Sequence, residues 1–185
     1  MLVSSGELVF LVIEESLSML AGDLKPNRLT FVKGGLPPLV GGLLSREMHT
    51  LVGMVGFYKH AYVIVYPTDD RGLLLDGVER LEARGEAAAS GDALQLAFLA
   101  ASPFAREGYS VRLVLFTDGD SNAGVPLRLV GDNLALNRVR VDVVGVGRLS
   151  SKDRGLLKSI ASETGGKFIH LTGGDVRVRL GQLLE

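Results

Sequence analysis

The chain has 185 residues, with 20 Lys and Arg against 21 Asp and Glu, and its mean hydropathy is +0.27. Hydrophobic residues make up 46% of it, which is enough to bury a full-sized core and excludes an intrinsically disordered chain. The net charge of -1 predicts no nucleic-acid or membrane partner, and the lack of cysteine excludes disulfides, iron–sulfur clusters and a thiol nucleophile.

The first apolar run is predicted to be neither a signal peptide nor a membrane span. Glu14 and Glu15 interrupt it, and no basic segment precedes it. A span needs about 20 apolar residues. We therefore expect a cytoplasmic protein with one domain over residues 1–185, because domains mostly fall between about 50 and about 250 residues.

Short apolar runs alternate with helical patterns along the chain, which predicts an α/β sandwich with a mostly parallel sheet. Val9–Ile13 is a continuous apolar run, typical of a strand covered on both faces. Residues 26–45 have helical spacing, but "GGLPPLVGG" predicts a break near Gly34 and Gly35. Thr50–Phe57 and Ala61–Tyr66 have the spacing of a β-hairpin. Further helices are predicted at 71–84, 92–101, 125–137, 151–166 and 176–184, and further strands at 111–119, 139–147 and 167–171.

Oxygen-bearing side chains follow two of the predicted strands. Glu14, Ser16 and Ser18 come after the first strand, and Asp118 comes after "VRLVLFT". In open α/β sheets, ligands bind beyond the carboxyl ends of the strands, so the four side chains converge if the two strands are neighbours. Hydroxyls and carboxylates without His or Cys suit Mg²⁺, Mn²⁺ or Ca²⁺ rather than zinc.

The same segments resemble von Willebrand factor A (vWA) domains. "IEESLSM" is similar, from Glu14 onward, to the Asp-x-Ser-x-Ser signature that opens the family's metal-ion-dependent adhesion site (MIDAS). "VLFTDGDSN" resembles the family strand that ends in Thr-Asp-Gly, with Asp118 as the second carboxylate. "MVGFYKHAYVIVYPTDD", "SGDALQLA" and "VDVVGVG" follow in the family's order, so the resemblance runs from about Glu7 to the end.

The resemblance implies a Rossmann-like three-layer sandwich. Its sheet has six mostly parallel strands in the order 3-2-1-4-5-6, with one antiparallel edge strand and helices on both faces. This order makes the first and fourth strands neighbours, as the convergence of the four side chains requires.

Two positions depart from the family pattern. Glu14 replaces the leading Asp, and its extra methylene moves the carboxylate out by about 1.5 Å. Mg²⁺ requires near-octahedral geometry at about 2.1 Å. Ala88 stands where the family has a metal-binding Thr, although Ser90 could replace it in a remodelled loop. We hypothesise a variant site that binds Mg²⁺ or Mn²⁺ at millimolar levels, with Glu14, Ser16, Ser18 and Asp118 as the candidate ligands.

Simpler roles compete with metal binding for these residues. Ser16 and Ser18 could cap the helix that follows, and Asp118 could form a turn with Gly119. Glu15 is interpreted as a solvated neighbour.

The resemblance implies a non-enzymatic protein-binding module. A partner Asp or Glu would complete the coordination of the metal. A metal-free variant would keep the fold and bind its partners elsewhere. The alternatives are a scaffold subunit that works with an AAA+ ATPase, and a metal-dependent phosphoryl hydrolase. For the hydrolase, Lys25 and Arg28 are the basic residues nearest to the site in sequence.

Overall fold

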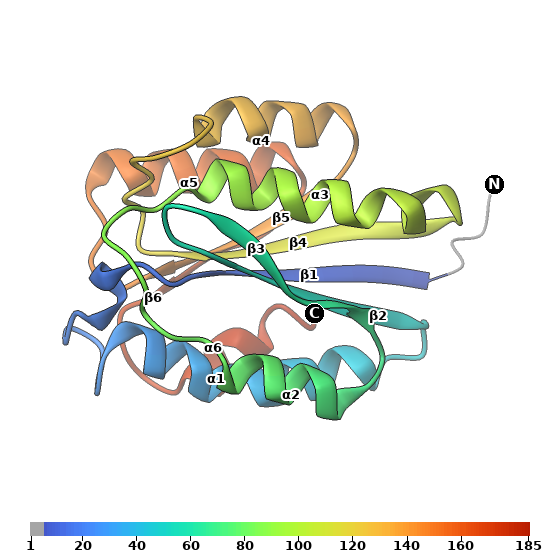
Figure 1. Cartoon of the computed structure of the whole chain (residues 1–185), viewed down its shortest axis with the longest axis horizontal. Helices are drawn as coiled ribbons and strands as arrows, with labels where there is room; N and C mark the ends of the chain where they lie inside the picture. Colours follow the sequence, from blue (N-terminus) through green and yellow to red (C-terminus); the bar gives the residue numbers. More distant parts are fainter. Residues whose placement is uncertain (1–5) are drawn as a thin grey trace.

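A six-stranded sheet forms the middle layer of the molecule (Figure 1). The computed structural model describes residues 6–185. The strand order is β3-β2-β1-β4-β5-β6, and only β3 runs antiparallel to its neighbour, which confirms the predicted sheet. The strands are β1 (Gly6–Glu14), β2 (Thr50–Phe57), β3 (Ala61–Thr68), β4 (Tyr109–Thr117), β5 (Arg140–Val146) and β6 (Phe168–Leu171).

Helices cover both faces of this sheet. In Figure 1, α3 (Ser90–Arg106), α4 (Leu127–Leu136) and α5 (Ser151–Glu163) lie above it, and α1 (Arg28–Leu44), α2 (Arg71–Glu79) and α6 (Val176–Gly181) lie below it. A 3₁₀ turn, η1 (Leu17–Leu20), follows β1 directly. None of the helices in residues 6–185 is long and apolar enough to cross a membrane.

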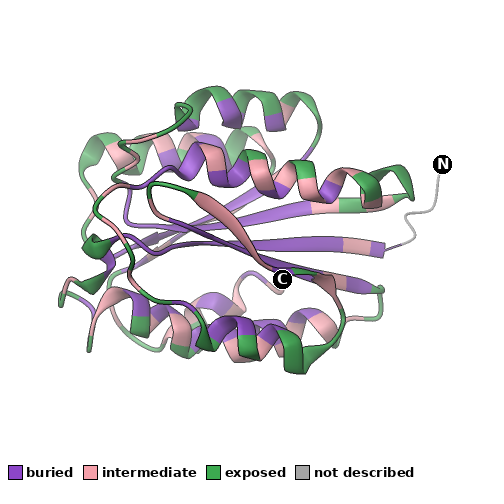
Figure 2. Ribbon diagram, in the orientation of Figure 1, coloured by how far each residue is buried: buried purple, intermediate pink, exposed green. Residues whose placement is uncertain are grey.

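The central strand β1 is buried on both faces (Figure 2). Side chains alternate across a strand, so Val9 and Leu11 pack with the α1 layer, and Leu8 and Phe10 pack with the α3 layer. This two-sided burial explains why the strand reads as a continuous apolar run. It also fixes the direction in which the polar residues after Ile13 leave the sheet.

The prediction of a broken first helix is wrong. α1 is one helix of 17 residues that continues through Pro37 and Pro38. Its glycines allow α6 to approach, since a Cβ atom on Gly35 would lie 2.6 Å from Leu180 Cδ1. Burial of the apolar side of α1 against α6 offsets the poor helix propensity of its prolines and glycines.

The helix α2 ends at Glu79, five residues before its predicted end. The following segment pairs with the end of β1 instead of continuing the helix. Arg84 N donates to Glu15 O at 2.7 Å, and Gly85 forms a parallel bridge with Ser16. This pairing holds the chain after β1 in place beside the candidate site.

Candidate functional site

Two neighbouring strand ends form the candidate site. β1 and β4 run parallel, with Ile13 beside Phe116, so the residues after them meet at one edge of the sheet. Asp118 N donates to Glu14 Oε2 at 3.1 Å. Ser16 Oγ donates to Glu14 Oε1 at 2.5 Å, and the hydroxyls of Ser16 and Ser18 lie 2.7 Å apart. The structure thus brings the four residues named from the sequence into one hydrogen-bonded cluster.

Glu14 is the buried centre of this cluster. Its side chain is fully buried, and Thr117 Oγ1 donates a further hydrogen bond to Oε2 at 2.7 Å. Burial and, to a smaller extent, the charge of Asp118 raise the pKa of Glu14 to about 7, although the hydrogen bonds from Ser16 and Thr117 act in the opposite direction. The Glu14 carboxyl is therefore protonated in a substantial fraction of the molecules at neutral pH.

The two serines have different surroundings. Ser16 is buried at the N-cap position of η1, but its hydroxyl caps no backbone N–H, so the capping interpretation is wrong for this residue. Ser18 is exposed on η1. Leu17 and Leu20, on either side of it, are 42% and 51% exposed. The buried cluster therefore reaches solvent at Ser18, between two exposed apolar side chains.

Arg28 is part of the site, although its sequence position indicated only a nearby basic residue. Its Nη1 lies 3.0 Å from Asp118 Oδ2. Its Nε and Nη2 donate to Asp23 Oδ1 and Oδ2 at 2.7 and 2.8 Å. The hydrogen bonds from Arg28 hold the pKa of Asp23 well below its usual range, and those to Asp23 raise the pKa of Arg28. One guanidinium thus joins two carboxylates that lie 95 residues apart in sequence.

Both positions considered for the missing threonine ligand are bonded to the loop after β4. Ala88 is buried, and its backbone N–H donates to Asn122 Oδ1 at 2.9 Å. Ser90 is also buried, and its Oγ donates to Ser121 Oγ at 2.6 Å. These bonds tie the loop before α3 to the loop after β4, which is a structural role.

The interpretation of Glu15 as a solvated residue is wrong. Its side chain is fully buried and accepts hydrogen bonds from the Tyr62 hydroxyl, from Glu82 N at 2.9 Å and from Arg84 Nε at 3.3 Å. Burial, together with the hydrogen bond to Glu15, raises the pKa of Tyr62 to about 12. Glu15 fastens β3 and the segment after α2 to the end of β1.

The oxygen donors of the site have the right chemistry for a hard divalent cation, but their arrangement does not fit one. Asp118 is paired with Arg28, and both oxygens of Glu14 already accept hydrogen bonds. Ala88 supplies only a methyl group. Within residues 6–185, no three or more His, Cys, Asp or Glu side chains form a group that could hold a metal ion.

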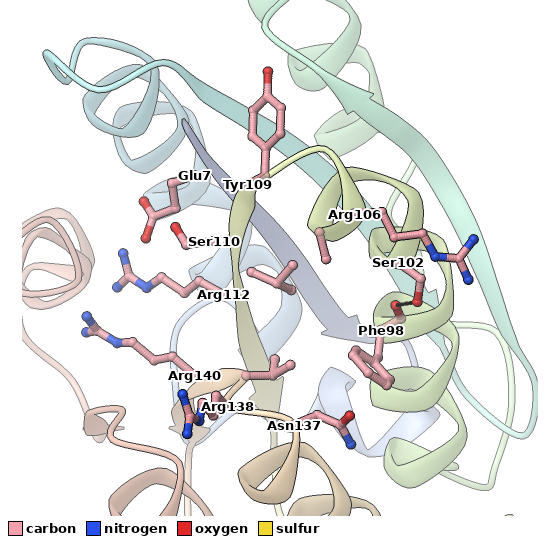
Figure 3. A pocket seen from close by; sticks show the side chains of 13 residues that line it. Glu7, Phe98, Ser102, Arg106, Tyr109, Ser110, Arg112, Asn137, Arg138 and Arg140 are labelled. Carbon is pink, nitrogen blue, oxygen red and sulfur yellow. Dashed lines mark hydrogen bonds between the residues drawn. The ribbon is translucent and has the colours of Figure 1, made fainter. Parts of the chain in front are cut away.

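A cavity of about 600 Å³ lies at the opposite edge of the sheet, near the amino ends of β4 and β5 (Figure 3). Arg112 and Arg140 extend from its wall away from Phe98. Both arginines pair with Asp142, and Arg112 Nη2 also donates to Leu183 O at 2.6 Å. Arg112 thus links β4 to Asp142 on β5 and to the carboxyl-terminal segment.

The fold and the site define a Rossmann-like domain with an oxygen-rich cluster where the strand order reverses. Residues 9–121 match the family model described as the von Willebrand factor type A domain. The match covers more than half of the 185 residues, so the chain belongs to the vWA domain family.

Three known proteins illustrate the similarity. A UPF0353 protein of Mycolicibacterium paratuberculosis (strain ATCC BAA-968 / K-10) is 31% identical over 118 residues, which is 62% of this chain and 34% of that protein. The chain therefore spans about a third of this relative. The crystal structure of an aerotolerance-related membrane protein from Bacteroides fragilis NCTC 9343 has a TM-score of 0.80 at 23% identity, over 96% of both chains. Proximal thread matrix protein 1 from the mussel byssus, in a form with a zinc-occupied MIDAS motif, has a TM-score of 0.77 at 18% identity, over 97% of this chain and 47% of that one.

Proposed function

We propose that this chain is a protein-binding module that docks its partner over the carboxyl edge of β1 and β4. Domains of the vWA family are typically protein-interaction modules. The observation that carries the proposal is the exposed rim of η1, where Leu17 and Leu20 flank the hydroxyl of Ser18. Protein interfaces combine desolvated apolar contacts with a few placed polar groups, and this rim offers both.

The metal-bridged mechanism expected from the sequence is one form of this proposal. In that form Ser16, Ser18 and Asp118, with Glu14, would hold Mg²⁺ or Mn²⁺, and the ion would bind a partner carboxylate. Two observations support it: the oxygen chemistry of the donors, and the zinc-occupied MIDAS motif of the mussel protein. The ion pair between Arg28 and Asp118 counts against it. The contacts favour a metal-free interface at the same edge.

Affinity capture with point variants of the bait tests the proposal. We expect Leu17→Glu and Leu20→Glu each to weaken partner binding by about tenfold or more, since a charge at the centre of an apolar contact removes a main binding contribution. Leu136→Glu is the matched control, because Leu136 is 85% exposed at the far end of α4, near the opposite edge of the sheet. The proposal is wrong if the Leu17 and Leu20 variants retain every partner. Loss of the partner in EDTA would establish the metal-bridged form instead.

A further inference from the structure

Arg28 places a positive charge between two carboxylates at the strand-end site. It is the first residue of α1, and the hydrogen bonds of its guanidinium reach Asp118 on one side and Asp23 on the other. We propose that Arg28 is the resident cation of this site, which makes the domain independent of divalent metal. We therefore expect a neutral residue at position 28 to open the carboxylates of Asp118 and Asp23 to a divalent ion.

The burial of the ion pair supports this role. The side chain of Asp118 is 2% exposed, and that of Arg28 is 11% exposed. An ionised carboxylate at such a depth needs a paired cation, because its hydration is lost. Arg28 meets this need for Asp118. A divalent ion that approached the same carboxylate would meet the charge of the guanidinium and be repelled by it.

The guanidinium is held in place from several segments. Asp23 Oδ2, which accepts from Arg28 Nη2, also accepts from Arg148 N at 2.8 Å. Gly147 has a φ of +70°, and a Cβ atom there would lie 2.3 Å from Arg28 Nε. The loop after β5 therefore needs a glycine for the guanidinium to fit. Exposed ion pairs are usually mobile and contribute little, whereas this one is positioned by three parts of the chain.

A neutral residue at position 28 would change the charge of the cluster. Asp23 and Asp118 would lose the cation that they share. The hydroxyls of Ser16 and Ser18 already lie in the hydrogen-bonded cluster that includes Asp118 N. Carboxylates and hydroxyls with no internal cation are the surroundings that a hard divalent ion prefers. Divalent metal should then bind the variant and stabilise it.

Titration of the isolated protein with Mn²⁺ tests this inference. The free ion is measured by electron paramagnetic resonance. We expect no binding to the wild type at millimolar Mn²⁺ and at least tenfold tighter binding to Arg28→Gln. In thermal unfolding, Mg²⁺ should raise the Tm of Arg28→Gln and leave that of the wild type unchanged. Adding Asp118→Asn to Arg28→Gln should abolish the gain. Arg128→Gln is the matched control, because Arg128 is a half-exposed arginine paired with Asp132 and Glu163 on the outer surface of α4 and α5.

Several results would overturn the inference. One is a wild type that binds Mn²⁺ at millimolar levels, and another is a folded Arg28→Gln variant without increased binding. If Arg28→Gln does not fold, Arg28→Lys replaces it in the test. The lysine variant keeps the positive charge and should fold without binding metal. Binding of Mn²⁺ by this variant would also contradict the inference. No partner is present in these measurements. Their failure is therefore distinct from a failure of the proposed docking surface.

Discussion

The buried carboxyl of Glu14 should make the stability of the domain depend on pH, and Glu14→Gln should remove that dependence. A glutamine can keep the local hydrogen bonds. Its carbonyl can accept from Thr117 Oγ1 and Asp118 N, and its amide can donate to Ser16 Oγ, which can in turn donate to Ser18. The substitution therefore removes the charge with little change in shape.

The magnitude follows from the raised pKa of Glu14, which moves from 4.5 to about 7 on folding. At about 1.4 kcal/mol per pKa unit, this shift corresponds to about 3 kcal/mol. Below pH 4.5 the carboxyl is protonated in both the folded and the unfolded state, so it costs nothing. Between pH 4.5 and 7 the unfolded state releases its proton first, so the free energy of unfolding falls as the pH rises. Above pH 7 the carboxyl is ionised in both states, and the free energy of unfolding is lowered by the full amount.

Urea unfolding at pH 4.5 and pH 8 measures this effect, with far-UV circular dichroism as the probe because the chain has no Trp. Relative to the wild type, Glu14→Gln should gain up to about 3 kcal/mol between the two pH values. Contributions from the other ionisable groups largely cancel in this double difference. Glu163→Gln is the control, since Glu163 is an exposed glutamate whose pKa is lowered, and it should show no such gain. If the difference between Glu14→Gln and wild type is the same at both pH values, the argument about burial is refuted.

Two further predictions concern packing and charge inside the domain, and thermal unfolding checks both. Gly34→Ala should stabilise α1 by about 1 kcal/mol, because the added Cβ atom would meet only Val176 at 4.0 Å. Gly35→Ala should destabilise α1 by about 1–3 kcal/mol, because the added Cβ atom would overlap α6. Equal effects would mean that α6 does not pack closely on this face of α1. Arg112→Met should cost about 3–5 kcal/mol, because it leaves Asp142 buried with only the partly exposed Arg140 as a charged partner. A neutral effect would show that Arg140 alone satisfies the carboxylate.

The strands were predictable because their signal is local. β2 has the predicted bounds, Thr50–Phe57, since a strand buried on both faces needs a continuous apolar run. The strand order came from the family resemblance, because pairing between distant segments leaves no trace in local spacing. The continuous α1 was missed for the same reason. Its glycines weaken a helix considered alone, and only the position of α6 shows that they allow close packing.

In the candidate site, too, local features were predictable and long-range contacts were not. Convergence of Glu14, Ser16 and Ser18 with Asp118 was predictable, since side chains two residues apart share a face and β1 and β4 end together. Asp23, Arg28 and the buried Glu15 were missed as parts of the site's framework. Their partners lie on loops whose paths depend on tertiary structure, as the separation of 90 residues between Arg28 and Asp118 shows.

Glu14, Ala88 and Arg28 all weaken the attraction of the site for a divalent ion. Ala88 supplies no oxygen at the position where the resemblance implies a metal-binding Thr. The raised pKa of Glu14 removes much of a negative charge at neutral pH, and Arg28 adds a positive one beside Asp118. With Glu14 protonated, Asp23 and Asp118 carry two negative charges against one positive charge, which leaves a net charge of only -1 to attract a divalent ion. The longer side chain of Glu14 therefore matters less for its reach toward a metal than for carrying its carboxyl into the core. There, hydrogen bonds from Thr117 and Asp118 join the ends of β1 and β4, and a third hydrogen bond comes from Ser16.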